Sequence, residues 1–236
     1  MTLPLLRWDV PGPYEVAFST RVGGVSKGPF ASLNLGLLTA DAAEHVTENR
    51  RRLCEALGAE PEQLAMNRQV HAATVNRATP GERGREGDGL WTDEPRVPML
   101  KVTADCLPLA LVRVNGDRPA LALLHAGRLG LLEGIVEAGM AALGGRVAAV
   151  IGPGIGPCCY EVADEVADAY RARLGATALR GRNLDLWTVT EQLLREAGAV
   201  SVERLDLCTA CDSERFFSHR RDRGSTGRQG VIGYVA

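Results

Sequence analysis

"LPLALVRVNGDRPALALLHAG" (residues 107–127) is the stretch that decides the fold class, because two apolar runs lie on either side of a short polar turn. Runs of this length rich in Leu, Val and Ala predict buried strands, and "NGD" at 115–117 is typical of a β-hairpin turn. The apolar segments over 97–106 and 146–154 predict one more strand before the hairpin and one after it. These residues therefore predict the centre of a β-sheet.

Helical periodicity alternates with strand periodicity along the rest of the chain. Residues 41–59, "DAAEHVTENRRRLCEALGA", predict a helix for which Asp41 is a candidate N-cap. Further helices are predicted over 128–143, near 160–174 and over 184–197. Further strands are predicted over 14–20, 69–78, 202–208 and 230–236. This alternation indicates an α/β protein, and because no repeat or linker divides the chain, we expect a single domain over 1–236.

The composition argues against several classes of partner. The chain has 236 residues, of which 45% are hydrophobic and 24% charged, as is usual for a globular protein. A net charge of -2 and a pI near 6.1 mean that the chain lacks the excess positive charge that would attract nucleic acid or an anionic membrane surface. We therefore expect neither as a partner. No apolar run approaches the roughly 18 residues of a membrane span, and the first residues do not resemble a secretion signal. We expect a cytoplasmic protein whose six cysteines are thiols or metal ligands.

Three apolar runs of the chain finish on side chains that bind soft or borderline metals. His71 follows "NRQV", Cys106 ends "MLKVTAD", and His125 ends "ALALL". Strand ends in one sheet can lie side by side, and two imidazoles with one thiolate would suit zinc and leave its fourth position open. The spacing is not a local metal-binding motif, so a buried Cys106 acting as a small hydrophobe stays open as the alternative.

The chain resembles the bacterial polyphenol oxidase or laccase-like family along most of its length. The resemblance rests on segments that follow one another from about residue 17 to the C-terminus: "STRVGGVSKGPFASLNLG" (19–36), "ENRRRL" (48–53), "QVH" (69–71), "DGLWTD" (88–93), "TADCLPLAL" (103–111), "HAG" (125–127), "IGPGIGPCCYEV" (151–162), "LDLW" (184–187) and "CTACDSERFFSHRRDRGSTGRQGVI" (208–232). Members of this family are described as multicopper oxidases, as peptidoglycan editing factors, and as zinc-dependent purine nucleoside phosphorylases with adenosine deaminase activity. The resemblance also implies a layered α/β domain with mixed sheets flanked by helices.

The resemblance assigns metal binding to His71, Cys106 and His125. It also points to Arg50, whose planar guanidinium is suited to inorganic phosphate, although "NRRR" (49–52) can equally be the solvated face of a helix. Asn34 and Ser26 are candidates for the lining of the same substrate pocket.

Asp105 lies next to Cys106 and is the candidate proton carrier of the reaction. The nucleobase deaminases that use Glu in a His-x-Glu motif are not matched, because no histidine here is followed by x-Glu.

The side chains available as metal ligands decide which of the activities described for this family the chain can support. A multicopper laccase needs many histidines in His-x-His pairs, and this chain has four histidines and no such pair. A lone copper remains possible in a His₂Cys site, with weak phenol oxidation, while zinc accounts more simply for hydrolytic chemistry. We therefore expect a zinc-dependent purine nucleoside phosphorylase with adenosine deaminase activity, acting on purine nucleosides and inorganic phosphate.

Two other functions stay open at this point. Cys106 with one histidine would make a thiol hydrolase or deamidase, which needs only one of the two imidazoles, whereas a zinc site needs both. A hydrolase that edits peptidoglycan precursors would use the same pocket.

Two further features concern the pocket and its surroundings. Cys208 and Cys211 form one Cys-x-x-Cys without a second, so we interpret them as two buried thiols at a strand end. The stretch "HAGRLG" (125–130) departs from the family's usual His-Ala-Gly-Trp-Arg-Gly, and in a helix from 128 onward a shift of one position turns a side chain by about 100°. We expect Arg128 to miss the contact of the family's arginine, so that zinc binding survives while activity weakens or changes.

Overall fold

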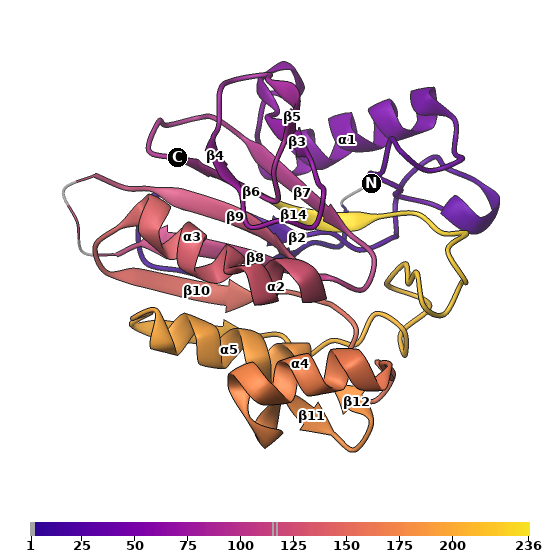
Figure 1. Cartoon of the computed structure of the whole chain (residues 1–236). Helices are drawn as coiled ribbons and strands as arrows, with labels where there is room; N and C mark the ends of the chain where they lie inside the picture. Colours follow the sequence, from indigo (N-terminus) through magenta and orange to yellow (C-terminus); the bar gives the residue numbers. More distant parts are fainter. Residues whose placement is uncertain (1–2, 115, 117) are drawn as a thin grey trace.

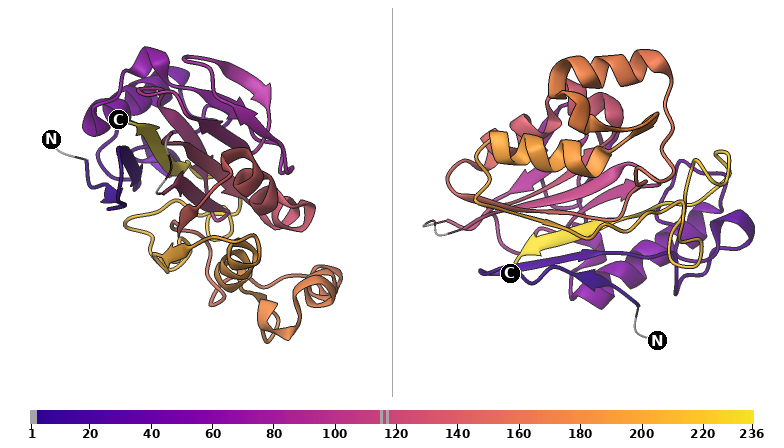
Figure 2. Two further views of the ribbon diagram at one scale, coloured as in Figure 1. Left: turned by 90° about the vertical axis from the view of Figure 1, so that its left-hand side faces the viewer. Right: turned by 90° about the horizontal axis from the view of Figure 1, so that it is seen from below.

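Two β-sheets pack face to face at the centre of the molecule, and helices cover both outer faces (Figures 1 and 2). This computed structural model describes residues 3–114, 116 and 118–236. The expected α/β fold with mixed sheets flanked by helices is confirmed. Whether 1–236 behaves as a single domain stays a prediction.

The larger sheet has six strands and is mixed. Its order is β13 (Ser201–Arg204), β10 (Val147–Ile151), β8 (Leu107–Arg113), β9 (Leu121–Ala126), β6 (Gly89–Thr92) and β4 (Val75–Arg77). The central pairs are antiparallel, while β13 with β10 and β4 with β6 are parallel at the two edges. The predicted hairpin is formed by β8 and β9, although residues 115 and 117 of its turn lie outside the described residues.

The smaller sheet is antiparallel and is closed by the end of the chain. Its order is β1 (Leu6–Arg7), β2 (Tyr14–Phe18), β14 (Gln229–Val235) and β7 (Met99–Thr103). Two short pairs lie outside these sheets, namely β3 (Met66–Arg68) with β5 (Arg83–Glu86) and β11 (Leu179–Arg180) with β12 (Asn183–Leu184).

Three apolar clusters fill the spaces between the four layers. The helices are α1 (Ala43–Leu57), α2 (Arg128–Glu133), α3 (Ile135–Leu143), α4 (Asp164–Leu174) and α5 (Leu186–Glu196), with 3₁₀ turns at Gly28–Phe30, Pro61–Gln63 and Ala176–Ala178. Successive strand residues face opposite sides of a sheet. Along β8, Leu109 therefore packs with α2–α5, whereas Ala110 packs against the smaller sheet. α1 covers the outer face of the smaller sheet through Leu53 and Leu57.

Three local expectations are corrected by the structure. The strand predicted over 69–78 is confirmed only at β4, which begins at Val75, because β3 ends at Arg68 and a loop lies between them. Asp41 is not the N-cap of α1; that position is Ala42, whose backbone N–H donates to the Asp41 carboxylate at 2.9 Å. The helix predicted over 128–143 is split at Gly134, whose φ of 96° suits glycine.

Within the described ranges, none of the helices combines the length and the apolar character that a membrane span requires.

Candidate metal centre

Strand register brings Cys106 and His125 together. In the β8–β9 ladder Pro108 lies opposite His125 and Leu107 opposite Ala126, so Cys106, just before β8, lies beside the end of β9. Gly127 leaves room for them, because a Cβ at this position would lie 3.0 Å from the Cys106 Sγ and 3.1 Å from Cδ2 of His71. The third residue of "HAG" therefore has to be small for the thiol and the imidazoles to converge.

His71 reaches this point from the loop between β3 and β4 rather than from a strand end. Its backbone is left-handed, with a φ of 63°, and its ring lies 4.9 Å from that of His125 in an edge-to-face arrangement. The candidate ligand atoms of His71, Cys106 and His125 all lie within 4.8 Å of one another. His71 is exposed and His125 is buried, so one side of the group faces solvent. Two imidazoles and one thiolate fit the donor preferences of zinc, and of copper.

Asp88 holds two of these residues in place and was not predicted from the sequence. It lies just before β6, where pairing with β9 sets it opposite His125, whose backbone N–H donates to the Asp88 carbonyl at 2.7 Å. The Asp88 carboxylate accepts the backbone N–H groups of Val70, His71 and Ala72 at 2.9–3.0 Å. It also lies 2.7 Å from Nδ1 of His125, which fixes that ring with its proton on Nδ1 and the Nε2 lone pair free for a metal.

Burial and hydrogen bonding have opposite effects on the pKa values of Asp88 and His125. Burial acts to raise the pKa of Asp88, but hydrogen bonds from His125 and from the backbone N–H groups of Ala72 and Val70 outweigh it and hold that pKa at about 2. Burial lowers the pKa of His125, against the opposing charge of Asp88. The imidazole is therefore neutral and the carboxylate charged at neutral pH, as a metal-ligating His–Asp pair requires.

Cys106 is a protonated thiol in the absence of a metal. Burial raises its pKa to about 12, and the charges of Asp105 and Asp88 act in the same direction. The charges of Arg228 and Arg128 act in the opposite direction. Among the described residues the Arg128 side chain forms no hydrogen bond or ion pair of its own, whereas Nη1 of Arg228 donates to the carbonyls of Thr226 and Gly227 at 3.0 and 2.9 Å.

Asp105 turns its carboxylate toward the C-terminal loops. Its backbone is left-handed, with a φ of 88°. One carboxylate oxygen accepts the Thr209 hydroxyl and the other accepts the backbone N–H of Arg220, both at 2.7 Å. Asp105 therefore ties the start of β8 to the loops that follow β13, and its role as a proton carrier stays a prediction.

The three predicted substrate-binding residues belong to a network beside the centre. Nε and Nη2 of Arg50 donate to the Leu35 carbonyl at 2.9 and 2.8 Å, and burial, with a smaller effect of Arg83, lowers the pKa of Arg50 to about 10. The backbone N–H of Leu35 donates to the Arg228 carbonyl at 2.9 Å. Arg50 thus supports the backbone of Arg228.

Asn34 and Ser26 continue the same network. The Asn34 side-chain oxygen accepts the backbone N–H groups of Gly36 and Arg228 at 3.0 and 2.8 Å, and Ser26 accepts from Asn49 at 2.9 Å. Within the part of the chain that the structure describes, none of the side-chain hydrogen bonds of Arg50, Asn34 and Ser26 reaches a candidate metal ligand. Their role as substrate-binding residues stays a prediction.

Lys101 and Tyr160 are further residues near the centre that sequence reasoning missed. The Lys101 side chain is fully buried and bonds Asn67; burial lowers its pKa to about 7, against the charge of Asp88. Burial raises the pKa of Tyr160, and the neighbouring Cys106 acts in the same direction. Lys101 lies in the otherwise largely apolar strand β7. Only the alternation of side chains between the two faces of a strand could have indicated that this lysine is buried.

Four of the remaining cysteines gather at a second place. Cys208 and Cys211 were predicted to be two buried thiols, but Cys211 is exposed, Cys208 is half-buried, and both lie beside Cys158 and Cys159.

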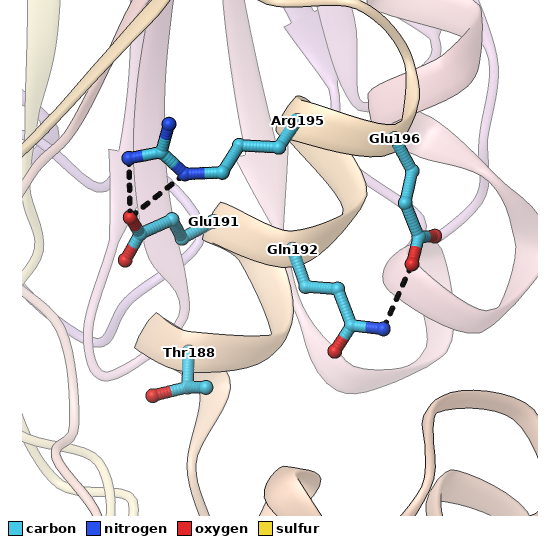
Figure 3. Close-up of a pocket in the computed structure, with 5 residues that line it drawn as sticks. All are labelled: Thr188, Glu191, Gln192, Arg195 and Glu196. Carbon is cyan, nitrogen blue, oxygen red and sulfur yellow. Dashed lines mark hydrogen bonds and ion pairs between the residues drawn. The ribbon is translucent and has the colours of Figure 1, made fainter.

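A hollow on α5 lies apart from both groups of cysteines and histidines. It is lined by Thr188, Glu191, Gln192, Arg195 and Glu196 (Figure 3). Arg195 pairs with Glu191 and Gln192 with Glu196 along the helix, so the polar groups that line it are already partnered. We interpret this hollow as the outer face of a surface helix.

The family model for multi-copper polyphenol oxidoreductase laccase matches residues 15–235 of the chain. The chain belongs to this family. Related members include a protein named purine nucleoside phosphorylase from Deinococcus radiodurans, which is 40% identical over 98% of this chain and 92% of its own length. A second, purine nucleoside phosphorylase YlmD from Geobacillus stearothermophilus, is 37% identical over 89% of this chain and 86% of its own length.

Solved structures of the family have the same fold. The crystal structure of protein NMB0706 from Neisseria meningitidis is 31% identical, covers 98% of both chains and has a TM-score of 0.89. That of YlmD from Geobacillus stearothermophilus is 35% identical, covers 98% of this chain and 96% of the other, and has a TM-score of 0.88. The resemblance predicted from the sequence is confirmed.

Proposed function

We propose that this protein is a zinc-dependent purine nucleoside phosphorylase that acts on purine nucleosides and inorganic phosphate. The observation that carries the proposal is the convergence of His71, Cys106 and His125 in a family with members named purine nucleoside phosphorylase. A bound zinc would act there as a Lewis acid toward an oxygen of the substrate. The expected cytoplasmic location stays a prediction.

The protein's own residues supply orientation and charge. Asp88 keeps Nε2 of His125 free and fixes the His71 loop. Phosphorolysis needs cations for the incoming phosphate, and a planar guanidinium can bind two phosphate oxygens at once. We propose that Arg228 binds phosphate beside Cys106, and that Arg50 acts mainly through Leu35 on the position of Arg228.

Adenosine deamination is the second activity proposed for the same pocket, with Asp105 as the proton carrier. Because both oxygens of its carboxylate accept hydrogen bonds, Asp105→Asn is expected to disturb the loops around Thr209 and Arg220 as well as the reaction. The control is Thr209→Val, which removes one of these bonds and keeps the carboxylate. We expect Thr209→Val to retain more deaminase activity than Asp105→Asn.

The alternatives are less well supported by the geometry. A thiol hydrolase needs a Cys106 thiolate, but without a metal the pKa of this thiol is about 12. Within the described residues, the two groups of three or more metal-ligating side chains are the His₂Cys set and a set of four cysteines, so a multicopper centre built from His-x-His pairs finds no ligands there. A single copper in the His₂Cys set and an editing role on peptidoglycan precursors stay alternatives.

The test is to measure metal content and products in the same preparation. Wild type is incubated with inosine, with and without inorganic phosphate, and with adenosine. We expect phosphate-dependent release of hypoxanthine and formation of inosine from adenosine. His71→Ala separates the accounts: a zinc enzyme loses metal and both activities, whereas a Cys106–His125 hydrolase keeps its activity.

A further inference from the structure

Two neighbouring loops each bring a pair of cysteines to the same end of the larger sheet, beyond the carboxyl ends of two of its strands. β10 and β13 are parallel neighbours, so the loops that follow them leave from the same edge, and a further bridge joins Gly154 to Cys208. The first loop carries two adjacent cysteines and the second a Cys-x-x-Cys pair. We call these residues the four-cysteine cluster: Cys158, Cys159, Cys208 and Cys211.

The sulfur positions suit one ion bound by four thiolates. All four sulfur atoms lie within 4.8 Å of one another, and Cys211 lies 3.5 Å from Cys158 and 3.4 Å from Cys159. A tetrahedral zinc with Zn–S bonds of about 2.3 Å separates its sulfur ligands by about 3.8 Å. A disulfide would bring two sulfurs to about 2.05 Å. The arrangement is therefore too open for a disulfide and close to that of a Cys₄ zinc site.

The surroundings do not explain the cluster as apolar packing. Cys158 and Cys211 are exposed and the other two cysteines are half-buried, whereas structural thiols are usually hidden in a core. The backbone N–H of Gly156 donates to the Cys208 sulfur at 3.2 Å, a contact that stabilises metal-bound thiolates.

Two arginines bond the backbone of the loops that carry the cluster. Nη1 of Arg221 donates to the Thr209 carbonyl at 2.8 Å, and Nη1 of Arg220 donates to the Glu161 carbonyl at 2.9 Å. Thr209 lies between two of the cysteines, and Glu161 lies two residues after another. Four thiolates around a divalent ion carry excess negative charge. Arg221 is already paired with Asp222, so Arg220 is the one of these two guanidinium groups that would offset it.

We propose that the four-cysteine cluster binds a second metal ion, a structural zinc. Four protein ligands close the coordination sphere, so this ion would organise the loops rather than react. Its position links it to the first centre, because Thr209 donates to Asp105 and the Ile155 backbone N–H donates to the Asp105 carbonyl at 2.8 Å. This inference does not depend on the catalytic activity proposed above.

Metal analysis of variants tests the inference without an activity assay. Wild-type protein purified under reducing conditions should contain two zinc ions per chain. The double variant His71→Ala/Cys106→Ala should keep one, and Cys208→Ser/Cys211→Ser should also keep one, from the other centre. Cys54→Ala, which removes a cysteine from the core of α1, is the matched control and should keep two.

A second measurement leaves all four cysteines of the cluster in place and remains valid if Cys208→Ser/Cys211→Ser does not fold. In cobalt-loaded His71→Ala/Cys106→Ala, the intense absorption of a tetrahedral cobalt tetrathiolate should appear, and the four thiols should resist alkylation until a chelator is added. The proposal is overturned if this variant contains no metal and binds no cobalt. It is equally overturned if mass spectrometry of freshly purified wild type finds a disulfide involving Cys211, or an iron–sulfur cluster instead of one ion.

Discussion

Replacing Asp88 by Asn would remove one negative charge beside the metal centre. The volume of the side chain would hardly change. The carboxylate uses one oxygen for Nδ1 of His125 and the backbone N–H of His71, and the other for the backbone N–H groups of Val70 and Ala72. An amide has only one oxygen, so its NH₂ group must face two of these four donors. Either the His71 loop loses its acceptor, or the ring of His125 loses the partner that keeps Nε2 free.

The size of the effect follows from these contacts. Two buried donors left without an acceptor cost about 1–3 kcal/mol each, so the free energy of unfolding should fall by about 2–6 kcal/mol. The pKa of Asp88 provides an independent value: the difference between about 3.9 in the unfolded chain and about 2 in the fold corresponds to roughly 2.5 kcal/mol at neutral pH. Loss of a carboxylate that orients a metal-binding histidine also weakens metal affinity by about 10- to 100-fold.

The pH dependence distinguishes this contribution from others. Because the pKa of Asp88 is depressed in the fold, its stabilisation is complete above the unfolded value near pH 4 and is lost as the pH falls toward 2. Denaturant unfolding of chelator-treated wild type should therefore lose stability over this window, and Asp88→Asn should lack that part of the loss.

The matched control is Asp93→Asn, at the far end of β6. Asp93 forms a surface ion pair with Arg77, so its replacement should change the free energy of unfolding by less than about 1 kcal/mol and leave metal content unchanged. The reasoning is refuted if Asp88→Asn binds zinc as tightly as wild type and unfolds at the same denaturant concentration.

Four further variants test separate parts of the centre. Gly127→Ala should crowd the ligands, destabilise the fold by about 1–3 kcal/mol and lower zinc affinity in a competition titration. Unchanged affinity would show that the ligands can move apart. Arg228→Lys should raise the KM for phosphate roughly tenfold, because a charged bidentate contact of about 1.5 kcal/mol is lost. Arg50→Lys should mainly lower the melting temperature. The reverse pattern would indicate that Arg50 is the phosphate ligand. Arg128→Trp with Leu129→Arg should raise phosphorolysis of inosine at constant zinc content, and no change in a folded variant would mean that this segment does not act on the substrate.

Local patterns in the sequence were sufficient for the hairpin and for two of the candidate ligands. Cys106 and His125 lie at the ends of apolar runs whose antiparallel pairing follows from a short turn, so their proximity could be anticipated. His71 was also singled out from the residues, but as a strand end, whereas it lies in a loop whose left-handed backbone at His71 is held by bonds to Asp88.

Contacts between distant segments could not be predicted. Asp88 lies in a polar loop and matters only because β6 pairs with β9 in one particular register. The two cysteine pairs meet because β13 adds to β10 in parallel, a choice that the residues between them do not encode locally. Likewise, nothing in "GVIGYVA" (230–236) indicates that β14 inserts between β2 and β7.

The most direct test of the central claim is the phosphate dependence of base release by protein of known metal content. Zinc-replete wild type and Cys106→Ala are incubated with inosine at several phosphate concentrations, and hypoxanthine and ribose 1-phosphate are quantified. The account predicts equal amounts of the two products in wild type, in proportion to the zinc bound by His71, Cys106 and His125, and neither product in Cys106→Ala. Zinc-replete wild type that releases no hypoxanthine with phosphate, or Cys106→Ala that releases it as fast as wild type, would contradict the account.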